Sequence, residues 1–334
     1  MSRRIFVTGG TGLVGSGIVR HFLAEGWDVV MGTSTPGLRP AHAALRIVPF
    51  HLSDPDTPVV RHALAGCTGV VHSAAMMPGT GSAADAAFAA QIVAANTIGT
   101  LGLLQAAAGA GVPHAALIGR TADHVDPAGA DVREEAKSVP RGPYGLSKHL
   151  SEAVGEYMDR ESSIGVAVLR ISAPYGPGYR VRAVIPTYVE RALAGEALEV
   201  WGTGARTQTF TYTADIARAC ALAIERRAAG VYNITGPEAV STLALARAVL
   251  GAVGQTGSRI EHIDREDPGE ADRVRISIDK ARAELGYEPA YDLNAGLREL
   301  VAARRHGHAP LWFTSNHPAG AEMTEAFSEP TQPA

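Results

Sequence analysis

Residues 8–15 read TGGTGLVG, and they stand between a short β-rich run, residues 5–8, and an amphipathic run, residues 16–25. This order of strand, glycine-rich turn and helix is the context that a dinucleotide-binding site requires. Position in the chain makes the signal stronger than three glycines alone. The stretch therefore predicts a dinucleotide site at the first strand of an α/β fold.

Each glycine of this turn has a physical task in such a site. Gly9 permits the tight turn, Gly12 lets the backbone approach a pyrophosphate, and Gly15 lets the helix pack closely on the sheet. The helix N-terminus then offers unpaired N–H groups to the phosphates. We expect Leu13 and Val14 of the same turn to lie beside the cofactor as well.

The first half of the chain alternates β-rich runs with helical runs, which is typical of a parallel sheet covered on both faces. The expected strands are residues 5–8, 28–32, 46–50, 69–73, 115–118 and 165–171. The expected helices, with apolar residues returning every three to four positions, are residues 16–25, 59–64, 85–110 and 144–160. Right-handed crossovers between them predict a doubly wound parallel Rossmann sheet.

After residue 173 prolines and glycines break the regular pattern. Further on, a helix is expected at residues 185–194, another at 213–226 and a strand at 230–234. The expected domains are listed by residue number: 1–173 as the dinucleotide domain with 210–236 returning to it, 174–209 and 237–305 as a smaller interlaced substrate lobe, and 306–334 as a mobile tail.

Composition excludes several classes of protein. The 334 residues are 46% hydrophobic with a formal net charge of -4, so no basic field gathers nucleic acid. Cys67 and Cys220 lack metal-like or disulfide-framework spacing, and we expect no metal. The N-terminus leaves no room for a signal peptide, and we expect no membrane-spanning run. A cytoplasmic enzyme acting on a small molecule is therefore expected.

Tyr144 and Lys148 stand four residues apart at the start of an expected helix, and so on one helix face. A phenol with a pKa near 10 is a poor base at neutral pH, but a neighbouring positive charge favours the phenolate and lowers that pKa. Tyr144 can then accept an alcohol proton during oxidation or donate it during reduction. A surface tyrosine and lysine is the alternative.

With these motifs the chain resembles the extended short-chain dehydrogenases/reductases, the branch of NAD-dependent epimerases and dehydratases. The resemblance covers roughly residues 3–300. Its further motifs are, in chain order, HSAA at 72–75, NTIGT at 96–100, PYGLSK at 143–148, LRI at 169–171 followed by YGP at 175–177, and YNI at 232–234. Their order and spacing are more specific than any single motif.

The resemblance implies that Lys148 also holds the nicotinamide ribose and that Thr121 binds the reacting oxygen and polarises a carbonyl during reduction. Thr121 as a plain strand-end hydroxyl is the alternative. Four further residues are assigned to the cofactor: Leu52, Ala74, Ala75 and Asn96. The substrate is assigned to Met76, Thr121, Tyr175 and Gln208.

The end of the second strand bears on the cofactor. An NAD site usually carries a carboxylate there for the ribose hydroxyls, but residues 29–35 read VVMGTST with no acid. Thr33, Ser34 and Arg39 can instead donate to a 2′-phosphate, unless Arg39 lies solvated in a loop. The sequence favours NADP, and NAD stays open.

Two departures from the family narrow the substrate. The 4,6-dehydratases of this branch carry Asp and Glu directly after the threonine, where this chain has Ala122 and Asp123. The epimerases hold the diphosphate of a nucleotide sugar with two arginines, and Gln208 and Asp267 stand at their places. Neither an amide nor a carboxylate replaces a bidentate phosphate clamp.

Three hypotheses remain. The first is a dehydrogenase or reductase for a sugar-like secondary alcohol, and the second is a nucleotide-sugar epimerase or ketoreductase, in which Arg206, Arg265 or Arg273 compensates for the clamp. The third is a non-catalytic NAD(P)-binding module. The resemblance further implies a homodimer, formed by a four-helix bundle of the helices at residues 85–110 and 144–160.

Overall fold

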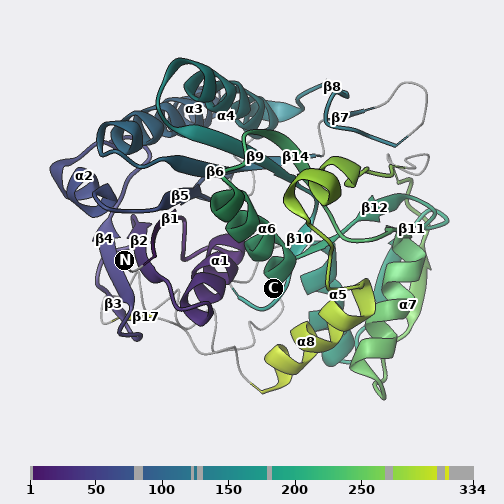
Figure 1. Cartoon of the computed structure of the whole chain (residues 1–334). Helices are drawn as coiled ribbons and strands as arrows, with labels where there is room; N and C mark the ends of the chain where they lie inside the picture. Colours follow the sequence, from purple (N-terminus) through teal and green to yellow (C-terminus); the bar gives the residue numbers. More distant parts are fainter. Residues whose placement is uncertain are drawn as a thin grey trace.

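The computed structural model describes residues 3–78, 86–121, 124–125, 131–178, 183–267, 274–306 and 313–315 (Figure 1). Seven parallel strands form the central sheet in the order β14-β9-β6-β5-β1-β2-β4. Their bounds are β1 (Arg4–Thr8), β2 (Asp28–Thr33), β4 (Leu45–Pro49), β5 (Gly69–His72), β6 (His114–Arg120), β9 (Gly165–Ile171) and β14 (Gly230–Ile234). The predicted doubly wound parallel sheet is confirmed.

The chain enters this sheet at β1, fills one side through β2 and β4, and then crosses to β5 on the other side of β1. A crevice opens at such a reversal, outside the carboxyl ends of the strands, and this is where open α/β sheets bind ligands. The topology thus positions the glycine-rich turn, which follows β1, at the reversal.

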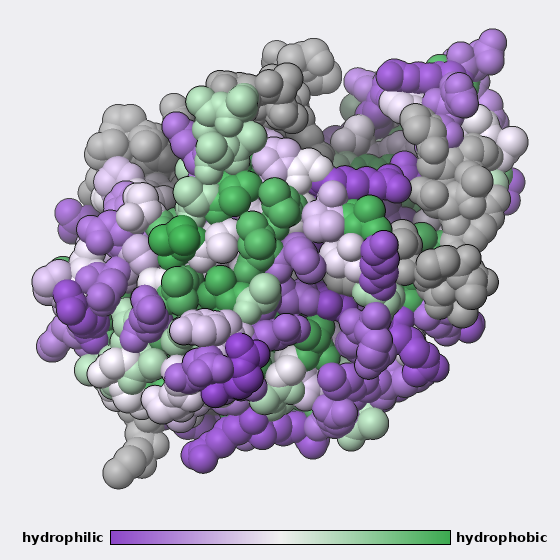
Figure 2. Space-filling view, turned by 90° about the horizontal axis from the view of Figure 1, so that it is seen from above, coloured by the Kyte–Doolittle hydropathy of each residue, from purple (hydrophilic) through white to green (hydrophobic). Residues whose placement is uncertain are grey.

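Helices cover both faces of the sheet (Figure 1). α1 (Leu13–Ala24) packs with α6 (Thr213–Arg226) on one face, and α2 (Pro58–Leu64), α3 (Ala86–Gly109) and α4 (Gly142–Glu161) cover the other. α3 packs along α4, and the outer surface of this pair carries exposed apolar side chains (Figure 2).

The membrane expectation needs one correction. Among the described residues, α3 is long and apolar enough to cross a membrane by length and composition alone. A core helix meets the same test, and α3 packs against α4 and α2 and buries Ile92, Leu103 and Leu104.

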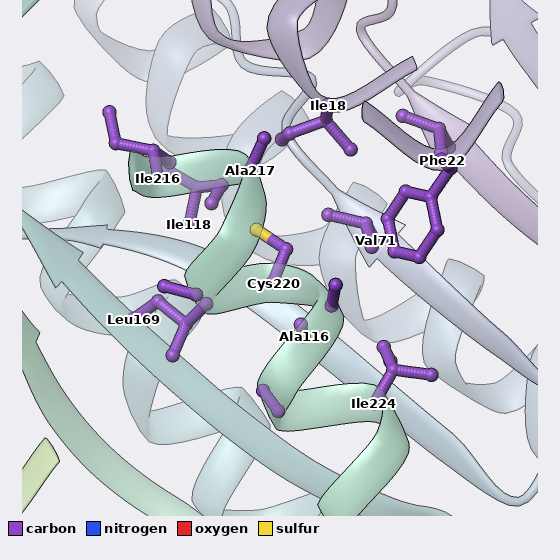
Figure 3. Packing of buried hydrophobic residues seen from close by; sticks show 14 of the residues in the cluster. Ile18, Phe22, Val71, Ala116, Ile118, Leu169, Ile216, Ala217, Cys220 and Ile224 are labelled. Carbon is purple, nitrogen blue, oxygen red and sulfur yellow. The ribbon is translucent and has the colours of Figure 1, made fainter. Parts of the chain in front are cut away.

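Strand alternation divides the sheet's core into two layers. Along β1, Ile5 and Val7 join the layer under α1 and α6, whereas Phe6 joins the layer under α2, α3 and α4. Figure 3 shows the first layer, where α6 presents Cys220 and Ile224 toward the sheet. Cys67 is buried in the second layer, so both cysteines are core residues.

A smaller lobe has its own core. It contains α5 (Val184–Leu193), α7 (Thr242–Val253), α8 (Leu293–Arg305) and the strand pairs β11 (Leu198–Trp201) with β16 (Ile260–Ile263), β12 (Thr207–Thr209) with β15 (Ala239–Ser241) and β10 (Pro174–Tyr175) with β13 (Thr211–Tyr212). β14 lies between these segments in sequence but pairs with β9 in the main sheet. These pairings support the interlaced division into two lobes, which we keep as a proposal.

The helices and strands that the sequence predicted are present with shifts at their ends, but α7, α8 and the short strand pairs of the smaller lobe were not predicted. α1 begins at Leu13 rather than at residue 16, because the glycine turn leads directly into the helix. The sequence pattern missed β3 (Leu38–Pro40), which pairs antiparallel with β17 (Phe313–Ser315). Residues 313–315 of β17 lie within the segment that the sequence describes as a mobile tail. Residues 307–312 and 316–334 lie outside the described part of the chain.

Candidate active site

A cavity of about 1280 Å³ lies along the carboxyl ends of the sheet strands, between the glycine turn and the smaller lobe. The ends of β1, β2, β5, β6 and β9 contribute to it, as do α5 and β12. The predicted site residues that line this cavity are Gly9, Gly12, Leu13, Val14, Gly15, Thr33, Ser34, Leu52, Ala74, Ala75, Met76, Thr121, Tyr144, Lys148, Tyr175 and Gln208.

The glycine turn fits a dinucleotide. Gly9 has a φ of 70°, and a Cβ there would lie 2.7 Å from the backbone nitrogen of Ala74. A Cβ on Gly15 would overlap the carbonyl oxygen of Gly9. Gly12 is the N-cap of α1, has no side-chain cap, and leaves an approach for a ligand because its Cβ would meet only Gly9 oxygen at 3.4 Å. The first N–H groups of α1 are thus available to a pyrophosphate.

Two predicted cofactor residues are not among the described residues that line the cavity. Arg39 lies in β3, paired with Thr314, and is exposed. Asn96 is 2% exposed on α3, where its amide oxygen accepts from the Met76 N–H at 2.6 Å and its Nδ2 donates to the Met76 carbonyl at 3.0 Å. Asn96 therefore holds the segment after β5 in place and contacts the site through Met76.

Asn96 also connects this segment to the helix that carries Tyr144. Its Nδ2 donates to Ser147 Oγ at 2.9 Å, and Ser147 Oγ donates to the Tyr144 carbonyl at 2.8 Å. All atoms of this link are buried or partly buried, and buried polar groups that are fully paired specify one arrangement. The first turn of α4 is thereby fixed relative to α3.

His72 joins the glycine-turn side to the same network. The Thr100 hydroxyl donates to the Asn96 carbonyl at 2.6 Å, so Thr100 Oγ1 must accept from His72 Nε2–H at 3.1 Å. His72 Nδ1 then accepts from the Thr8 hydroxyl at 2.7 Å, and Thr8 Oγ1 accepts from Ala74 N–H at 3.2 Å. Burial lowers the pKa of His72 to about 3, with a further contribution from Lys148, so the ring is neutral.

Tyr144 and Lys148 both face the cavity from α4, one turn apart. Tyr144 is half-buried and Lys148 is 8% exposed. Burial lowers the pKa of Lys148 to about 8, Glu152 opposes this shift, and Arg120 adds to it. The ammonium is still the main form at pH 7, so a cation lies beside the phenol as expected.

Glu152 is held by a buried ion pair. Arg170 of β9 donates to both carboxylate oxygens of Glu152, with Nε 3.0 Å from each, and to the Glu134 carbonyl at 2.6 Å. Because the Arg170 guanidinium binds this carboxylate, Glu152 offsets only part of the burial cost of Lys148. The pair also fixes α4 to β9.

Thr121 follows β6 and is 3% exposed. Its hydroxyl donates to the Ile171 carbonyl across 3.3 Å, which is a long hydrogen bond. In this rotamer the oxygen can accept from a substrate hydroxyl, and polarising a carbonyl requires that the hydroxyl turn toward the cavity. Ala122 and Asp123 lie outside the described residues.

Two of the expected substrate residues, Gln208 and Tyr175, expose different groups to the cavity. Gln208 of β12 is exposed at the cavity wall. Tyr175 contributes ring atoms, because its hydroxyl lies against Gly296 of α8, where an added Cβ would overlap it. Burial raises the pKa of Tyr175, so its phenol stays neutral.

Sequence reasoning missed two arginines in the cavity wall. Arg120 ends β6, and its guanidinium carbon lies 5.5 Å from the centroid of the Tyr144 ring. Arg141 is the N-cap residue of α4 and also lines the cavity. The available signal for Arg120 was a charged residue at the carboxyl end of a central strand, directly before Thr121.

Comparisons with known proteins agree with this geometry. The profile of the NAD dependent epimerase/dehydratase family matches residues 5–235. The chain is 30% identical over 323 residues to a dTDP-glucose 4,6-dehydratase of Streptomyces niveus, covering 92% of this chain and 94% of that protein. It is also 30% identical over 325 residues to a dTDP-4-dehydro-6-deoxy-D-allose reductase of Streptomyces bikiniensis, covering 91% and 97%.

A solved structure extends this similarity to the fold. DesIV, a dTDP-glucose 4,6-dehydratase from Streptomyces venezuelae with NAD and TYD bound, is 28% identical with a TM-score of 0.76, covering 91% of this chain and 97% of that one. The predicted resemblance is confirmed, and the protein is an enzyme that uses an NAD-type dinucleotide. The chain belongs to the NAD dependent epimerase/dehydratase family, within the extended short-chain dehydrogenases/reductases.

Proposed function

We propose that the protein transfers a hydride between a nicotinamide dinucleotide and a secondary alcohol or ketone of a sugar-like substrate, with Tyr144 moving the proton. The observation that carries this proposal is that Tyr144, Lys148 and Thr121 line the same cavity as the glycine turn. The bound nicotinamide supplies or accepts the hydride. Tyr144 takes the hydroxyl proton during oxidation and returns it to the carbonyl oxygen during reduction.

Lys148 has two tasks in this proposal. Its ammonium stabilises the Tyr144 phenolate, and its N–H groups would hold the nicotinamide ribose. Burial of the ammonium strengthens both interactions, because charges attract more strongly in a low-dielectric site. Thr121 orients the substrate oxygen from the end of β6.

We favour a dehydrogenase or reductase whose substrate lacks a nucleotide diphosphate. Asp267, at the place of one clamp arginine, is 10% exposed and lies 3.6 Å from Arg206. This carboxylate competes with a phosphate for that guanidinium. The guanidinium carbon of Arg265 lies 3.8 Å from the Trp201 ring centroid, and Arg265 is not among the described residues of the cavity wall. Arg273 lies outside the described part of the chain.

A nucleotide-sugar epimerase or 4-ketoreductase is the second candidate. Arg206 favours it, because this side chain lines the cavity two residues before Gln208. A diphosphate that displaces Asp267 from Arg206 would gain one cationic contact. The relatives named above are a dehydratase and a reductase of dTDP-linked sugars, which supports a sugar substrate for either candidate.

Cofactor retention separates these candidates. A reductase must exchange its dinucleotide at each turnover, whereas an epimerase keeps it through oxidation and return reduction. We expect the purified protein, desalted and then denatured, to release far less than one dinucleotide per chain, as read from the absorbance of the supernatant. Stoichiometric NAD would favour the epimerase.

We infer NADP as the preferred dinucleotide. Thr33 and Ser34 line the cavity at the end of β2, and no carboxylate is present among residues 29–35 to repel a 2′-phosphate. Arg39 adds no support, because it is exposed in β3 and outside the described wall. DesIV binds NAD, so NAD is the alternative.

We propose a homodimer through α3 and α4. Their outer surface exposes Ile98 at 63%, Tyr157 at 49% and Leu146 at 42%, and Figure 2, viewed from the side of these helices, shows apolar side chains gathered there. A two-fold axis would bring the pair against its copy as a four-helix bundle. We keep a cytoplasmic location as a prediction from the sequence.

Ile98→Glu tests this dimer by sedimentation. We expect the variant to be monomeric, because a carboxylate is costly in an apolar interface. Val59→Glu is the matched control, since Val59 is 44% exposed on α2, outside this pair. A wild-type monomer, or an Ile98→Glu dimer, would contradict the proposal.

A further inference from the structure

Arg120 brings a charge into the part of the cavity where the proton moves. It is the last residue of β6, directly before Thr121, and its guanidinium carbon lies 5.5 Å from the Tyr144 ring centroid. The side chain is half-buried and lines the cavity. Any group that contacts this guanidinium is therefore close to a substrate oxygen that meets Tyr144.

The formally charged side chains of the described cavity wall are all basic, and one of them, Arg206, is paired with Asp267. The wall contains Arg120, Arg141, Lys148 and Arg206, and it contains neither Asp nor Glu. The whole chain has a formal net charge of -4, so this wall is opposite in sign to the protein. A low-dielectric cavity lined by one sign of charge concentrates ligands of the other sign.

The cofactor does not account for Arg120. Its pyrophosphate is expected at the glycine turn and the N-terminus of α1, whereas Arg120 lies beside Tyr144 at the end of β6. Arg206 lies in the smaller lobe, next to β12, and is paired with Asp267. The two arginines thus reach the cavity from different elements, Arg120 from the end of β6 and Arg206 from the segment before β12.

We propose that the substrate carries a carboxylate close to its reacting carbon and that Arg120 binds this carboxylate as the specificity-determining residue. The inference rests on the proposed function, because it takes the reacting carbon to be at Tyr144. A planar guanidinium pairs with a carboxylate through two parallel N–H···O bonds, which fixes orientation as well as charge. The substrate class is a sugar acid or a similar hydroxy or keto acid.

Lys148 provides a second readout. Burial, opposed by Glu152 and aided by Arg120, lowers its pKa to about 8. A carboxylate on Arg120 offsets that repulsion and favours the ammonium. Binding of an acid near pH 8 should therefore be accompanied by proton uptake, and binding of its neutral counterpart should not.

The test compares acids with their neutral counterparts by calorimetry on the dinucleotide-loaded protein. The probes are two pairs, D-glucuronate with D-glucose and UDP-glucuronate with UDP-glucose. Within each pair the acid carries a carboxylate where the neutral sugar carries a hydroxymethyl group. We expect the acid of at least one pair to bind about tenfold to a hundredfold more tightly than its partner. Equal binding within both pairs, or no saturable binding of either acid, would overturn the proposal.

Variants assign the preference to one side chain. Arg120→Met should lower the acid-to-neutral ratio toward one, because Arg141 and Lys148 remain in the wall. Arg120→Lys should keep more of the ratio, because its charge stays although the planar guanidinium is lost. Arg206→Met is the matched control and should leave the ratio unchanged. An unchanged ratio in Arg120→Met, with dinucleotide affinity intact, would contradict the assignment.

Failure of this inference is distinguishable from failure of the proposed function. The measurement needs no turnover, and Tyr144→Phe should keep the acid preference while losing activity. An inactive wild type that prefers acids would refute only the hydride proposal. An active wild type without the preference would refute only the role of Arg120.

Discussion

The two ends of the cavity differ in what forms their walls. At the end where we propose that the dinucleotide binds, the wall is backbone: Gly9, Gly12 and Gly15 allow close approach, and α1 begins there. At the substrate end the wall is side chains, including Arg120 and Gln208. A site made by backbone geometry constrains sequence tightly, whereas one made by side chains can change its ligand through single substitutions.

Tyr144→Phe should have the largest effect, and that effect should be confined to the substrate end of the cavity. We expect kcat to fall about 10³-fold, because only the proton-transfer hydroxyl is lost. Dinucleotide affinity should hold, since the glycine turn is untouched. Tyr157→Phe, a 49% exposed tyrosine on the same helix, is the control for steady-state kinetics. A near wild-type rate in Tyr144→Phe would refute the mechanism.

Lys148 lies between the two ends, and its buried ammonium should make the free energy of unfolding depend on pH. Burial moves its pKa from the ordinary 10.5 to about 8, which corresponds to about 3 kcal/mol. The unfolded chain therefore holds more protons between about pH 8 and pH 10.5, so the unfolding free energy rises with pH across that window. Lys148→Met should lack this rise in urea denaturation of the dinucleotide-free protein. Identical pH slopes would show that Lys148 is not desolvated.

Gly15→Ala tests whether the dinucleotide end depends on backbone. The added methyl would overlap the Gly9 carbonyl and displace the turn. We expect dinucleotide affinity, measured by fluorescence titration, to fall about a hundredfold. Gly109→Ala is the control, because nothing lies within 4 Å of its added Cβ. If both variants bind alike, the turn does not hold the pyrophosphate.

Thr33→Asp should have the smallest effect of these variants. It tests which of the two dinucleotides, NADP or NAD, the glycine-turn end of the cavity prefers. A carboxylate at the end of β2 repels a 2′-phosphate, so the ratio of NADP to NAD affinity should fall about tenfold. Thr33→Ser keeps the hydroxyl that accepts from Thr35 N–H at 3.1 Å and should behave as wild type. A constant ratio would mean that Thr33 does not face the adenosine ribose.

The sequence predicted the sheet well because strands such as β1, β2 and β9 are buried, mostly apolar runs and the glycine turn identifies β1. Among the elements that it missed are β3 and β17. Each is only three residues long, and they pair across more than 270 residues of chain, as with Arg39 and Thr314, so neither has a local signal. Short pairings of this kind depend on tertiary contacts.

The candidate site was predictable where residues act through fixed spacing, as Tyr144 and Lys148 do on one helix. Asn96 was assigned to the cofactor because its motif was recognised, but its bonds to Met76 depend on how α3 packs. Arg120 had no motif, because its importance comes from lying over the Tyr144 ring. Residues that act through packing rather than spacing escape a sequence pattern.

The buried ring of His72 has a spectroscopic consequence. Both ring nitrogens are occupied, by Thr8 and Thr100, and the side chain is 3% exposed. Its Nε2 proton is donated to Thr100 of α3 and is therefore shielded from bulk water. That proton should therefore give a slowly exchanging downfield line in a proton NMR spectrum. Its exchange rate with water would report how often the segment under the active site opens locally.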